Sequence, residues 1–328
     1  MDSSTQSSRK LESDCQCFHS FISGVDETSQ HKLLEIFTSR SLEEIKHIRE
    51  LYSALYNQDL LHLLRSTRRD NALTKAAYLC MREPHERDAE IIRNVLFGDR
   101  VDLNTLIEVV CTRSSSELQG TKQAYRSQYN SDIEQDVSLK AHGGFKEILL
   151  AILRSSRNYG GRVDVSMAMC DAKTLYEAME SGKYVDQKTI LSLISQRSSG
   201  QFKTILDSYK QLYGSEFSKS LKRNKCGQFG KDLRIAVRCL QYPEKYLSKK
   251  LQRSVNSFDA QEALIRIVIT RSGVDVKDIN NAYRNKTGYS LENLIRREFN
   301  TTANRNKIST DKACDLTVEI LVGLLNRC

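Results

Sequence analysis

Apolar residues recur in four similar runs along the chain, and each run ends at an arginine followed by a serine. Within a run, two apolar pairs are separated by one residue, which is the spacing of one face of an amphipathic helix. The apolar positions are Leu33, Leu34, Ile36 and Phe37, then Leu106, Ile107, Val109 and Val110, then Ile190, Leu191, Leu193 and Ile194, and finally Leu264, Ile265, Ile267 and Val268. The pattern predicts four equivalent helices that end at Arg40, Arg113, Arg197 and Arg271.

A second helix is predicted to begin directly after each arginine. The serine that follows stands three residues before a carboxylate or amide side chain. The pairs are Ser41 and Glu44, Ser114 and Glu117, Ser198 and Gln201, and Ser272 and Asp275. This is the sequence of a capping box, in which both side chains accept hydrogen bonds from backbone N–H groups that the first turn leaves unpaired. One helix therefore ends and another begins at the same place in each copy.

A tyrosine stands twelve residues after each arginine, at Tyr52, Tyr125, Tyr209 and Tyr283. Five residues further on come Asn57, Asn130, Gly214 and Gly288, residue types that tolerate the left-handed conformation ending many helices. A third helix is predicted after each of them from Leu60 and Leu64, Ile133 and Val137, Phe217 and Leu221, and Leu291 and Ile295. The repeated unit therefore contains several helices.

The arginines lie 73, 84 and 74 residues apart, which predicts four units of about 70 residues. Pro84 and Pro243 mark unit boundaries, and Asn158-Tyr159-Gly160-Gly161 lies in a linker that explains the longer middle gap. We expect a polar tail at 1–12, repeats at 13–83, 84–155, 167–241 and 242–328, and a linker at 156–166. The molecule should have two halves of two units each.

Composition narrows the class of protein further. Alternating β-branched runs are absent, so the chain is predicted to be all-α. It has no apolar run of membrane-spanning length and no signal-peptide core, and its nine cysteines are expected to be reduced thiols. We therefore expect a cytoplasmic protein. The net charge of +9 favours anionic partners but does not choose among lipid headgroups, nucleic acid and acidic protein surfaces.

Several motifs resemble the annexin family, in particular its plant branch. They are Asp88-Ala89 with Ile92, the run from Glu108 to Ser114, and Tyr242-Pro243-Glu244-Lys245-Tyr246, and the match extends from Asp14 to Leu325. The resemblance implies a curved disc of four five-helix repeats. It also implies that loops on the convex face bind calcium and, through it, acidic phospholipid.

The loops depart from the family pattern where calcium would bind. The family has Gly-x-Gly-Thr in the first loop, whereas the loops here begin at Gly24, Gly98, Gly182 and Ser257 without that motif. The second loop should supply a carboxylate, but the residues there are Thr67, Lys140, Asn224 and Glu298. Calcium needs oxygen ligands that include negative charge. We therefore predict weakened calcium binding, with Glu298, the carbonyls of Ser257 and Phe258, and Gly24, Gly98 and Gly182 as the remaining candidates.

Basic side chains stand around the positions that lack carboxylates. They are Arg65, Arg68, Arg69, Lys140, Lys222, Arg223, Lys225, Arg296 and Arg297. The resemblance places them on the membrane-facing surface, where each would contribute roughly 1 kcal/mol towards an anionic leaflet. We expect direct binding to anionic phospholipid membranes to replace part of the calcium-dependent binding. Tyr184 stands where some annexins have an exposed aromatic residue and is a further lipid-binding candidate.

Other functions remain open at this stage. Cys111 and Cys239 stand where plant annexins have a cysteine pair with an ascribed redox role, and Ile265-Arg266-Ile267 resembles a tripeptide linked to actin binding. The alternative hypothesis is a cytosolic redox-sensitive, actin-binding or nucleic-acid-binding scaffold without a calcium site. No specific nucleic acid is predicted, self-association on membranes is a further expected interaction, and no motif with catalytic spacing predicts an enzyme.

Overall fold

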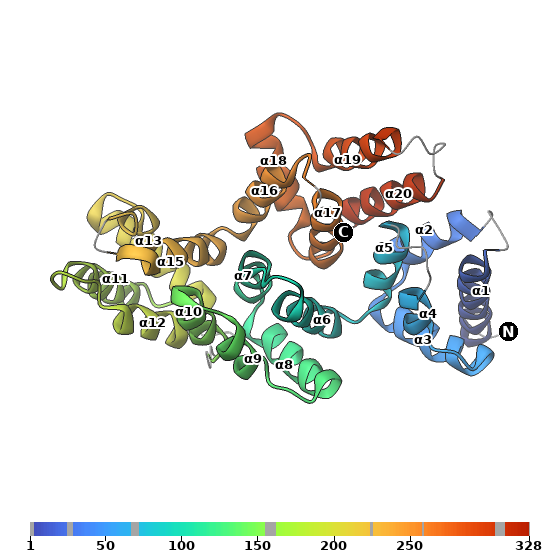
Figure 1. Ribbon diagram of the computed structural model, residues 1–328, viewed down its shortest axis with the longest axis horizontal. Coiled ribbons are helices and arrows are strands. Elements are labelled where there is room, and N and C mark those ends of the chain that lie inside the picture. Colours follow the sequence, from blue (N-terminus) through green and yellow to red (C-terminus); the bar gives the residue numbers. More distant parts are fainter. Residues whose placement is uncertain are drawn as a thin grey trace. The chain divides into compact units, whose positions relative to one another are not determined.

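The described part of the chain is entirely helical wherever it is regular (Figure 1). The computed structural model describes residues 3–24, 29–66, 72–154, 162–223, 226–257, 259–305 and 312–327. Across these residues twenty helices, α1 to α20, follow one another as four sets of five. The all-α prediction and the four five-helix repeats are confirmed.

The second and third repeats form one compact unit, Pro84–Tyr246. The second repeat contains α6 (Pro84–Phe97), α7 (Leu103–Thr112), α8 (Ser115–Tyr129), α9 (Ile133–Lys140) and α10 (Gly143–Leu153). The third repeat contains α11 (Val165–Glu180), α12 (Gln187–Gln196), α13 (Ser199–Tyr213), α14 (Phe217–Ser220) and α15 (Gly227–Gln241). The two repeats are joined by α15 packing on α7 and α10, and by α12 packing on α10.

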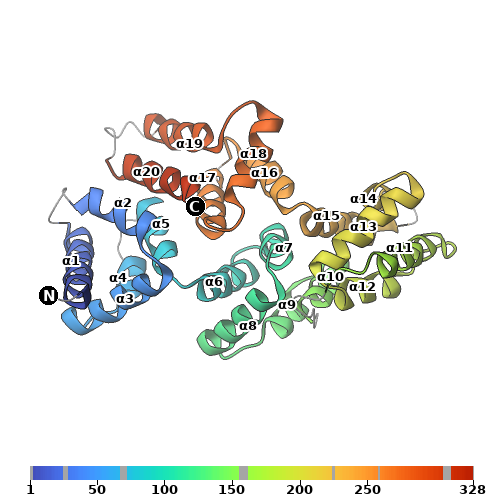
Figure 2. The same ribbon diagram turned by 180° about the vertical axis from the view of Figure 1, so that it is seen from behind.

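The first and fourth repeats form the other compact unit, Met1–Glu83 with Leu247–Cys328. The first repeat contains α1 (Ser3–Ser23), α2 (Ser29–Ser39), α3 (Leu42–Tyr56), α4 (Leu60–Ser66) and α5 (Ala72–Met81). The fourth contains α16 (Pro243–Ser254), α17 (Ala260–Arg271), α18 (Val276–Thr287), α19 (Leu291–Arg305) and α20 (Lys312–Asn326). Helices α2 and α5 pack on α20, and α5 also packs on α17 (Figure 2).

The chain divides into two halves of two repeats each, as the sequence predicts. The sequence did not indicate which repeats pair, and the structure pairs the first repeat with the fourth and the second with the third. A contact near the C-terminus shows why. The guanidinium of Arg327 donates to the carbonyl of Arg40 at 2.5 Å and to that of Phe37 at 3.5 Å, so it caps the end of α2.

The arginine that repeats along the sequence is a structural residue. In three repeats it forms a two-pronged ion pair with an aspartate on the first helix, 25 or 26 residues earlier. The shortest N–O distances are 2.8 Å for Arg40 and Asp14, 2.5 Å for Arg113 and Asp88, and 2.6 Å for Arg197 and Asp171. The fourth repeat has Lys245 and Tyr246 at those places, and Arg271 pairs with Asp275 instead.

The capping boxes form in two of the four predicted places, after Arg40 and after Arg113. Ser198 also caps its helix, but the Gln201 side chain bonds both the backbone N–H and the carbonyl of Asp164. The prediction of the fourth box is wrong. Residues 272–275 form a turn before α18, because the Asp275 carboxylate is held by Arg271 and does not cap the helix.

The tyrosine and helix-end predictions hold in all four repeats. Tyr52, Tyr125, Tyr209 and Tyr283 are buried, and Asn57, Asn130, Gly214 and Gly288 adopt the left-handed conformation. A second aromatic position, four residues after the buried tyrosine, packs on the first helix in three repeats. Tyr56 stacks on His19, Tyr129 lies under the Arg93 guanidinium, and Tyr213 stacks on Tyr176. Each stack adds about 0.5–1.5 kcal/mol to the packing of these helices.

The segment predicted as a polar tail, residues 1–12, is helical from Ser3 onwards, where α1 begins. The segment continues the first amphipathic helix towards the N-terminus. Among the side chains described from Arg9 onwards, the first buried ones are Asp14 and Cys15.

Candidate functional site

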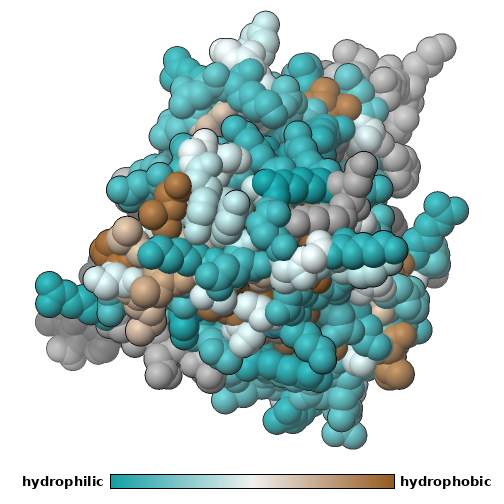
Figure 3. Space-filling view, turned by 90° about the vertical axis from the view of Figure 1, so that its left-hand side faces the viewer, coloured by the Kyte–Doolittle hydropathy of each residue, from teal (hydrophilic) through white to brown (hydrophobic). Residues whose placement is uncertain are grey.

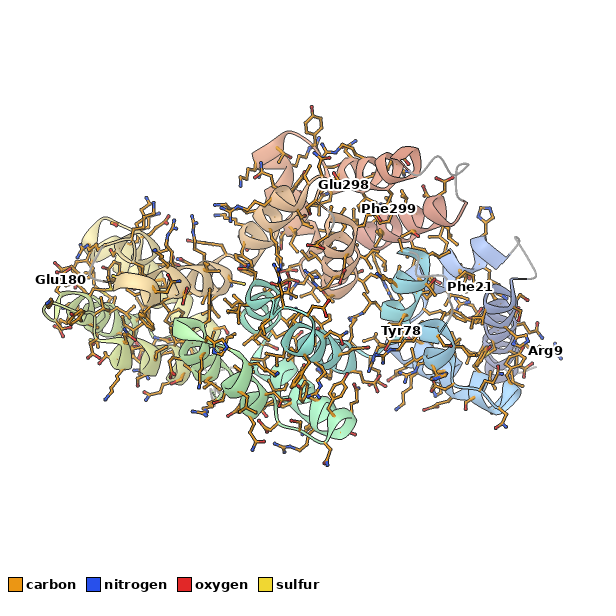
Figure 4. The ribbon with its side chains drawn as sticks, in the orientation of Figure 1. Arg9, Phe21, Tyr78, Glu180, Glu298 and Phe299 are labelled. Carbon is orange, nitrogen blue, oxygen red and sulfur yellow. The ribbon has the colours of Figure 1, made fainter. Side chains whose placement is uncertain are left out.

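In the fourth repeat the predicted carboxylate meets the predicted loop. Glu298 lies on α19, is only 6% exposed, and accepts a hydrogen bond at 3.2 Å from the backbone N–H of Asn256 in the loop after α16 (Figure 4). Its other oxygen accepts from Arg297 at 3.2 Å. Ser257, the candidate carbonyl ligand, accepts from the Ala260 N–H. Phe258 lies outside the described residues.

In the third repeat a salt bridge joins the two loops. Glu180 ends α11, shortly before Gly182 (Figure 4). Its carboxylate pairs with Arg223 after α14. The hydrogen bond from Arg223 to Glu180 raises the pKa of the guanidinium. Gly182 has a positive φ of 119°, so the loop turns at the predicted glycine. The cation thus occupies the space between the loops.

In the second repeat a cation–π contact joins the loops. Lys140 is the last residue of α9, and its amine lies 4.8 Å from the ring centre of Phe97, the last residue of α6. The Arg93 guanidinium lies 3.7 Å from the centre of the same ring. Gly98 follows Phe97 and donates its backbone N–H to Asn94. A positive charge therefore stands where the family pattern requires a carboxylate.

These three contacts share a spacing that the sequence contained. Asn256 and Glu298 are 42 residues apart, Glu180 and Arg223 are 43 apart, and Phe97 and Lys140 are also 43 apart. The sequence interpretation considered the first-loop glycines and the second-loop side chains, but not contacts between the two loops. It therefore missed Asn256, Glu180 and Phe97 as contact residues. In the first repeat, Thr67, Arg68 and Arg69 lie outside the described residues, and Gly24 has a positive φ of 71°.

Among the described loop residues, the groups around the second-loop positions are poor ligands for a calcium ion of the family type. Calcium is bound by six to eight oxygens, with carboxylates among them. The Glu298 carboxylate here receives N–H donors, and the second and third repeats present Lys140 and Arg223. Within the described ranges, no three histidine, cysteine, aspartate or glutamate side chains cluster together.

The predicted lipid-binding cations fall into two groups. Arg65, Lys140 and Lys222 lie at or near the ends of α4, α9 and α14, and Lys222 is exposed. Arg223, Arg296 and Arg297 instead make ion pairs with carboxylates. The sequence predicts Arg296 and Arg297 in a loop, but α19 continues through Arg305 because no proline or glycine interrupts it. Asn224 and Lys225 lie outside the described residues.

Tyr184 is 69% exposed in the loop between α11 and α12, and the Lys183 amine lies 5.5 Å from its ring centre. Both residues are therefore available to an interface at the same end of α11 as the Glu180–Arg223 pair. On the face drawn in Figure 3, hydrophilic residues predominate and hydrophobic ones form small, separate patches.

The redox and actin candidates are mostly buried. Cys111 on α7 and Cys239 on α15 both lie close to Tyr246, where burial raises the pKa of the tyrosine and the two thiols and Glu108 raise it further. Ile265 and Ile267 are core residues of α17, which leaves Arg266 as the partly exposed member of the tripeptide. None of the described helices combines the length and apolar character needed to cross a bilayer.

Comparisons with known proteins agree with this architecture. A family model described as Annexin matches residues 13–68, 87–152, 170–234 and 246–302. Annexin D7 from Arabidopsis thaliana is 30% identical over 272 residues, covering 83% of this chain and 85% of the relative. Annexin A13 from Homo sapiens is 31% identical over 270 residues, covering 82% of this chain and 85% of the relative.

Solved structures show the same fold. Annexin III aligns with a TM-score of 0.81 at 24% identity, covering 95% of this chain and 93% of that one. The calcium-bound annexin (Sm)1 structure aligns with a TM-score of 0.75 at 20% identity, covering 95% of this chain and 90% of that one.

Four five-helix repeats, in three of which a contact joins two loops 42 or 43 residues apart, define a class of all-helical repeat proteins. The chain belongs to the annexin family. Annexins are known for calcium-dependent binding to phospholipid membranes, and they are generally non-enzymatic scaffolds.

Proposed function

We propose that this annexin binds anionic phospholipid membranes with a calcium dependence weaker than that of the family, because basic side chains at the loop ends contact the headgroups directly. The observation that carries the proposal is Lys140. It stands where a calcium-binding repeat would place a carboxylate, and it has no carboxylate partner among the described residues.

Protein groups take over the bridging role of a metal in three repeats. The Glu180–Arg223 salt bridge, the Lys140–Phe97 contact and the Asn256–Glu298 hydrogen bond each join the two loops of one repeat. A calcium ion would have to displace these contacts before it could collect oxygen ligands. The loops can therefore keep their shape without the ion.

The attraction to the membrane comes from cations that are not neutralised by a carboxylate. Each basic residue near an anionic surface contributes about 1 kcal/mol, and the attraction falls off within a Debye length of about 8–10 Å. Arg223, Arg296 and Arg297 count for less because Glu180, Glu292, Glu319 and Glu298 already neutralise them. Lys140, Lys222 and Lys183 are the main contributors among the described residues.

Vesicle sedimentation tests the proposal. In the presence of a calcium chelator, the protein should bind phosphatidylserine vesicles at about 0.05 M salt and lose most of that binding at about 0.5 M, because salt screens the attraction. The double variant Lys140→Glu, Lys222→Glu should bind at least roughly thirtyfold more weakly, because each lost cation removes about 1 kcal/mol and each new carboxylate adds repulsion.

The matched control makes the same change in net charge at Lys203 and Lys210, which are exposed on α13. If the control variant weakens binding as strongly as the loop variant, the attraction is a property of net charge and the loop ends are not the site. If chelator abolishes binding, and if binding in the presence of calcium survives added salt, then calcium bridging is the mechanism and the proposal is wrong. The alternative scaffold hypothesis predicts no vesicle binding under any of these conditions.

A further inference from the structure

The third repeat brings two tyrosines from different helices face to face. Tyr176 on α11 and Tyr213 at the end of α13 have ring centres 4.0 Å apart, and their ring planes are inclined by only 8°. Aromatic pairs more often have ring centres about 4.5–7 Å apart, in offset or edge-to-face arrangements. The two phenol rings are therefore in direct van der Waals contact.

Solvent reaches both rings of this stack. Tyr176 and Tyr213 are partly exposed, and neither hydroxyl forms a hydrogen bond with another of the described residues. Burial raises the pKa of Tyr213, and Tyr176 and Glu177 raise it further, so Tyr213 is a neutral phenol at pH 7. A neutral phenol is oxidised by losing one electron and one proton, and here the proton can pass directly to water.

Three other tyrosine pairs differ from this stack in geometry and in exposure. Each of these pairs lies one turn apart on a single helix, and its first member is buried, so an oxidant in solution reaches only the second ring. The pairs are Tyr52 and Tyr56, Tyr125 and Tyr129, and Tyr209 and Tyr213, with ring planes inclined by 44°, 61° and 54°.

We propose that Tyr176 and Tyr213 form an oxidative modification site, at which a peroxidase and hydrogen peroxide join the two rings as dityrosine. Each phenol loses one electron and one proton, and together these reduce one hydrogen peroxide to two waters. The two phenoxyl radicals form a carbon–carbon bond between ring positions ortho to the hydroxyls. Each bonded carbon then releases its hydrogen as a proton, and each phenoxyl oxygen takes up a proton, which restores both phenols.

The cross-link locks α11 to α13 in the third repeat. Because the two rings are already in contact, coupling within one molecule is favoured over coupling between molecules at low protein concentration. Tyr176 and Tyr213 are 37 positions apart in the chain. A covalent bridge that closes a loop of this length restricts the unfolded chain and stabilises the fold, as a disulfide does. The site needs neither a cysteine nor a membrane, so it is independent of the proposed function.

Oxidation of the whole protein at low concentration, with a haem peroxidase and hydrogen peroxide, tests the proposal. The monomer should acquire dityrosine fluorescence and lose the mass of two hydrogen atoms. A proteolytic digest should contain a cross-linked pair of peptides that carries Tyr176 and Tyr213. Tyr213→Phe keeps the ring and removes the phenol, so the dityrosine fluorescence of the monomer should fall at least roughly tenfold, because no second pair has both rings exposed and in contact.

Tyr129→Phe is the matched control. Tyr129 is also partly exposed and also packs on a tyrosine, but Tyr125 is buried and its ring plane is inclined by 61°. The dityrosine fluorescence of the oxidised Y129F monomer should therefore equal that of wild type. At high protein concentration the same oxidant should join molecules into dimers through Tyr184 and Tyr289, which are 69% and 66% exposed.

Two results would overturn the modification site. One is the formation of dimers at high concentration while the monomer carries no dityrosine, and the other is equal dityrosine fluorescence in the Y213F and wild-type monomers. The oxidised wild-type monomer should also unfold at a higher temperature than the oxidised Y213F monomer, because only the former carries the bridge. Equal unfolding temperatures would show that the bridge does not lock the two helices.

Discussion

Replacing Arg113 with alanine is expected to lower the free energy of unfolding by about 3–5 kcal/mol. The Arg113 guanidinium and the Asp88 carboxylate are both almost fully buried and form two hydrogen bonds, at 2.5 and 2.8 Å. Removing one partner leaves a carboxylate without its counter-charge in the core of the second repeat, which costs far more than the net value of the pair. Urea denaturation monitored by circular dichroism measures the change.

The equivalent arginine of the third repeat provides the control. Arg197 makes the same two-pronged pair with Asp171, but its side chain is 27% exposed. After Arg197→Ala, water can solvate the Asp171 carboxylate, so the decrease in the free energy of unfolding should be clearly smaller than for Arg113→Ala. The double variant Asp88→Ala, Arg113→Ala should recover part of the stability lost in the single variant. Equal losses at Arg113 and Arg197, without recovery in the double variant, would show that burial of the pair is not what sets the cost.

Replacing Gly323 with valine is expected to destabilise the unit formed by the first and fourth repeats by about 3 kcal/mol. A Cβ at this position on α20 would lie 2.5 Å from Cγ2 of Thr38 on α2. Glycine and valine differ little in helix propensity, so the steric clash determines whether the substitution stabilises or destabilises the protein. Thr38 cannot withdraw easily, because its hydroxyl donates to the Leu34 carbonyl at 2.7 Å and its branched side chain is stiff at χ1. Thermal unfolding reports the loss.

A size-matched pair of changes tests the cause. Thr38→Ser removes the clashing methyl group and keeps the hydroxyl. In that background Gly323→Ala should be neutral or stabilising, because alanine is favoured over glycine by about 1 kcal/mol in a helix. If Gly323→Ala remains strongly destabilising in the T38S background, the close approach of α2 and α20 is not the reason for the glycine.

The sequence identified several important residues but could not identify the residues that they contact. The Arg-Ser repeat predicted where helices end, but the Asp14, Asp88 and Asp171 partners became visible only when the first and second helices of a repeat packed together. Likewise, the sequence identified Lys140 at one carboxylate position and Arg223 beside another. Their contacts with Phe97 and Glu180 depend on how two loops 43 residues apart are brought together.

The sequence by itself determined the helical class, the fourfold repetition, and the left-handed ends at Asn57, Asn130, Gly214 and Gly288, because helix periodicity and capping depend on residues within a few turns of each other. It also predicted weakened calcium binding, since the loops lack the Gly-x-Gly-Thr motif and only Glu298 supplies a carboxylate at the second-loop position. Only the tertiary structure decided that the first repeat pairs with the fourth, that Arg296 and Arg297 are neutralised on α19, and that the rings of Tyr176 and Tyr213 lie face to face. These outcomes depend on contacts between segments far apart in the chain, and no local pattern specifies them.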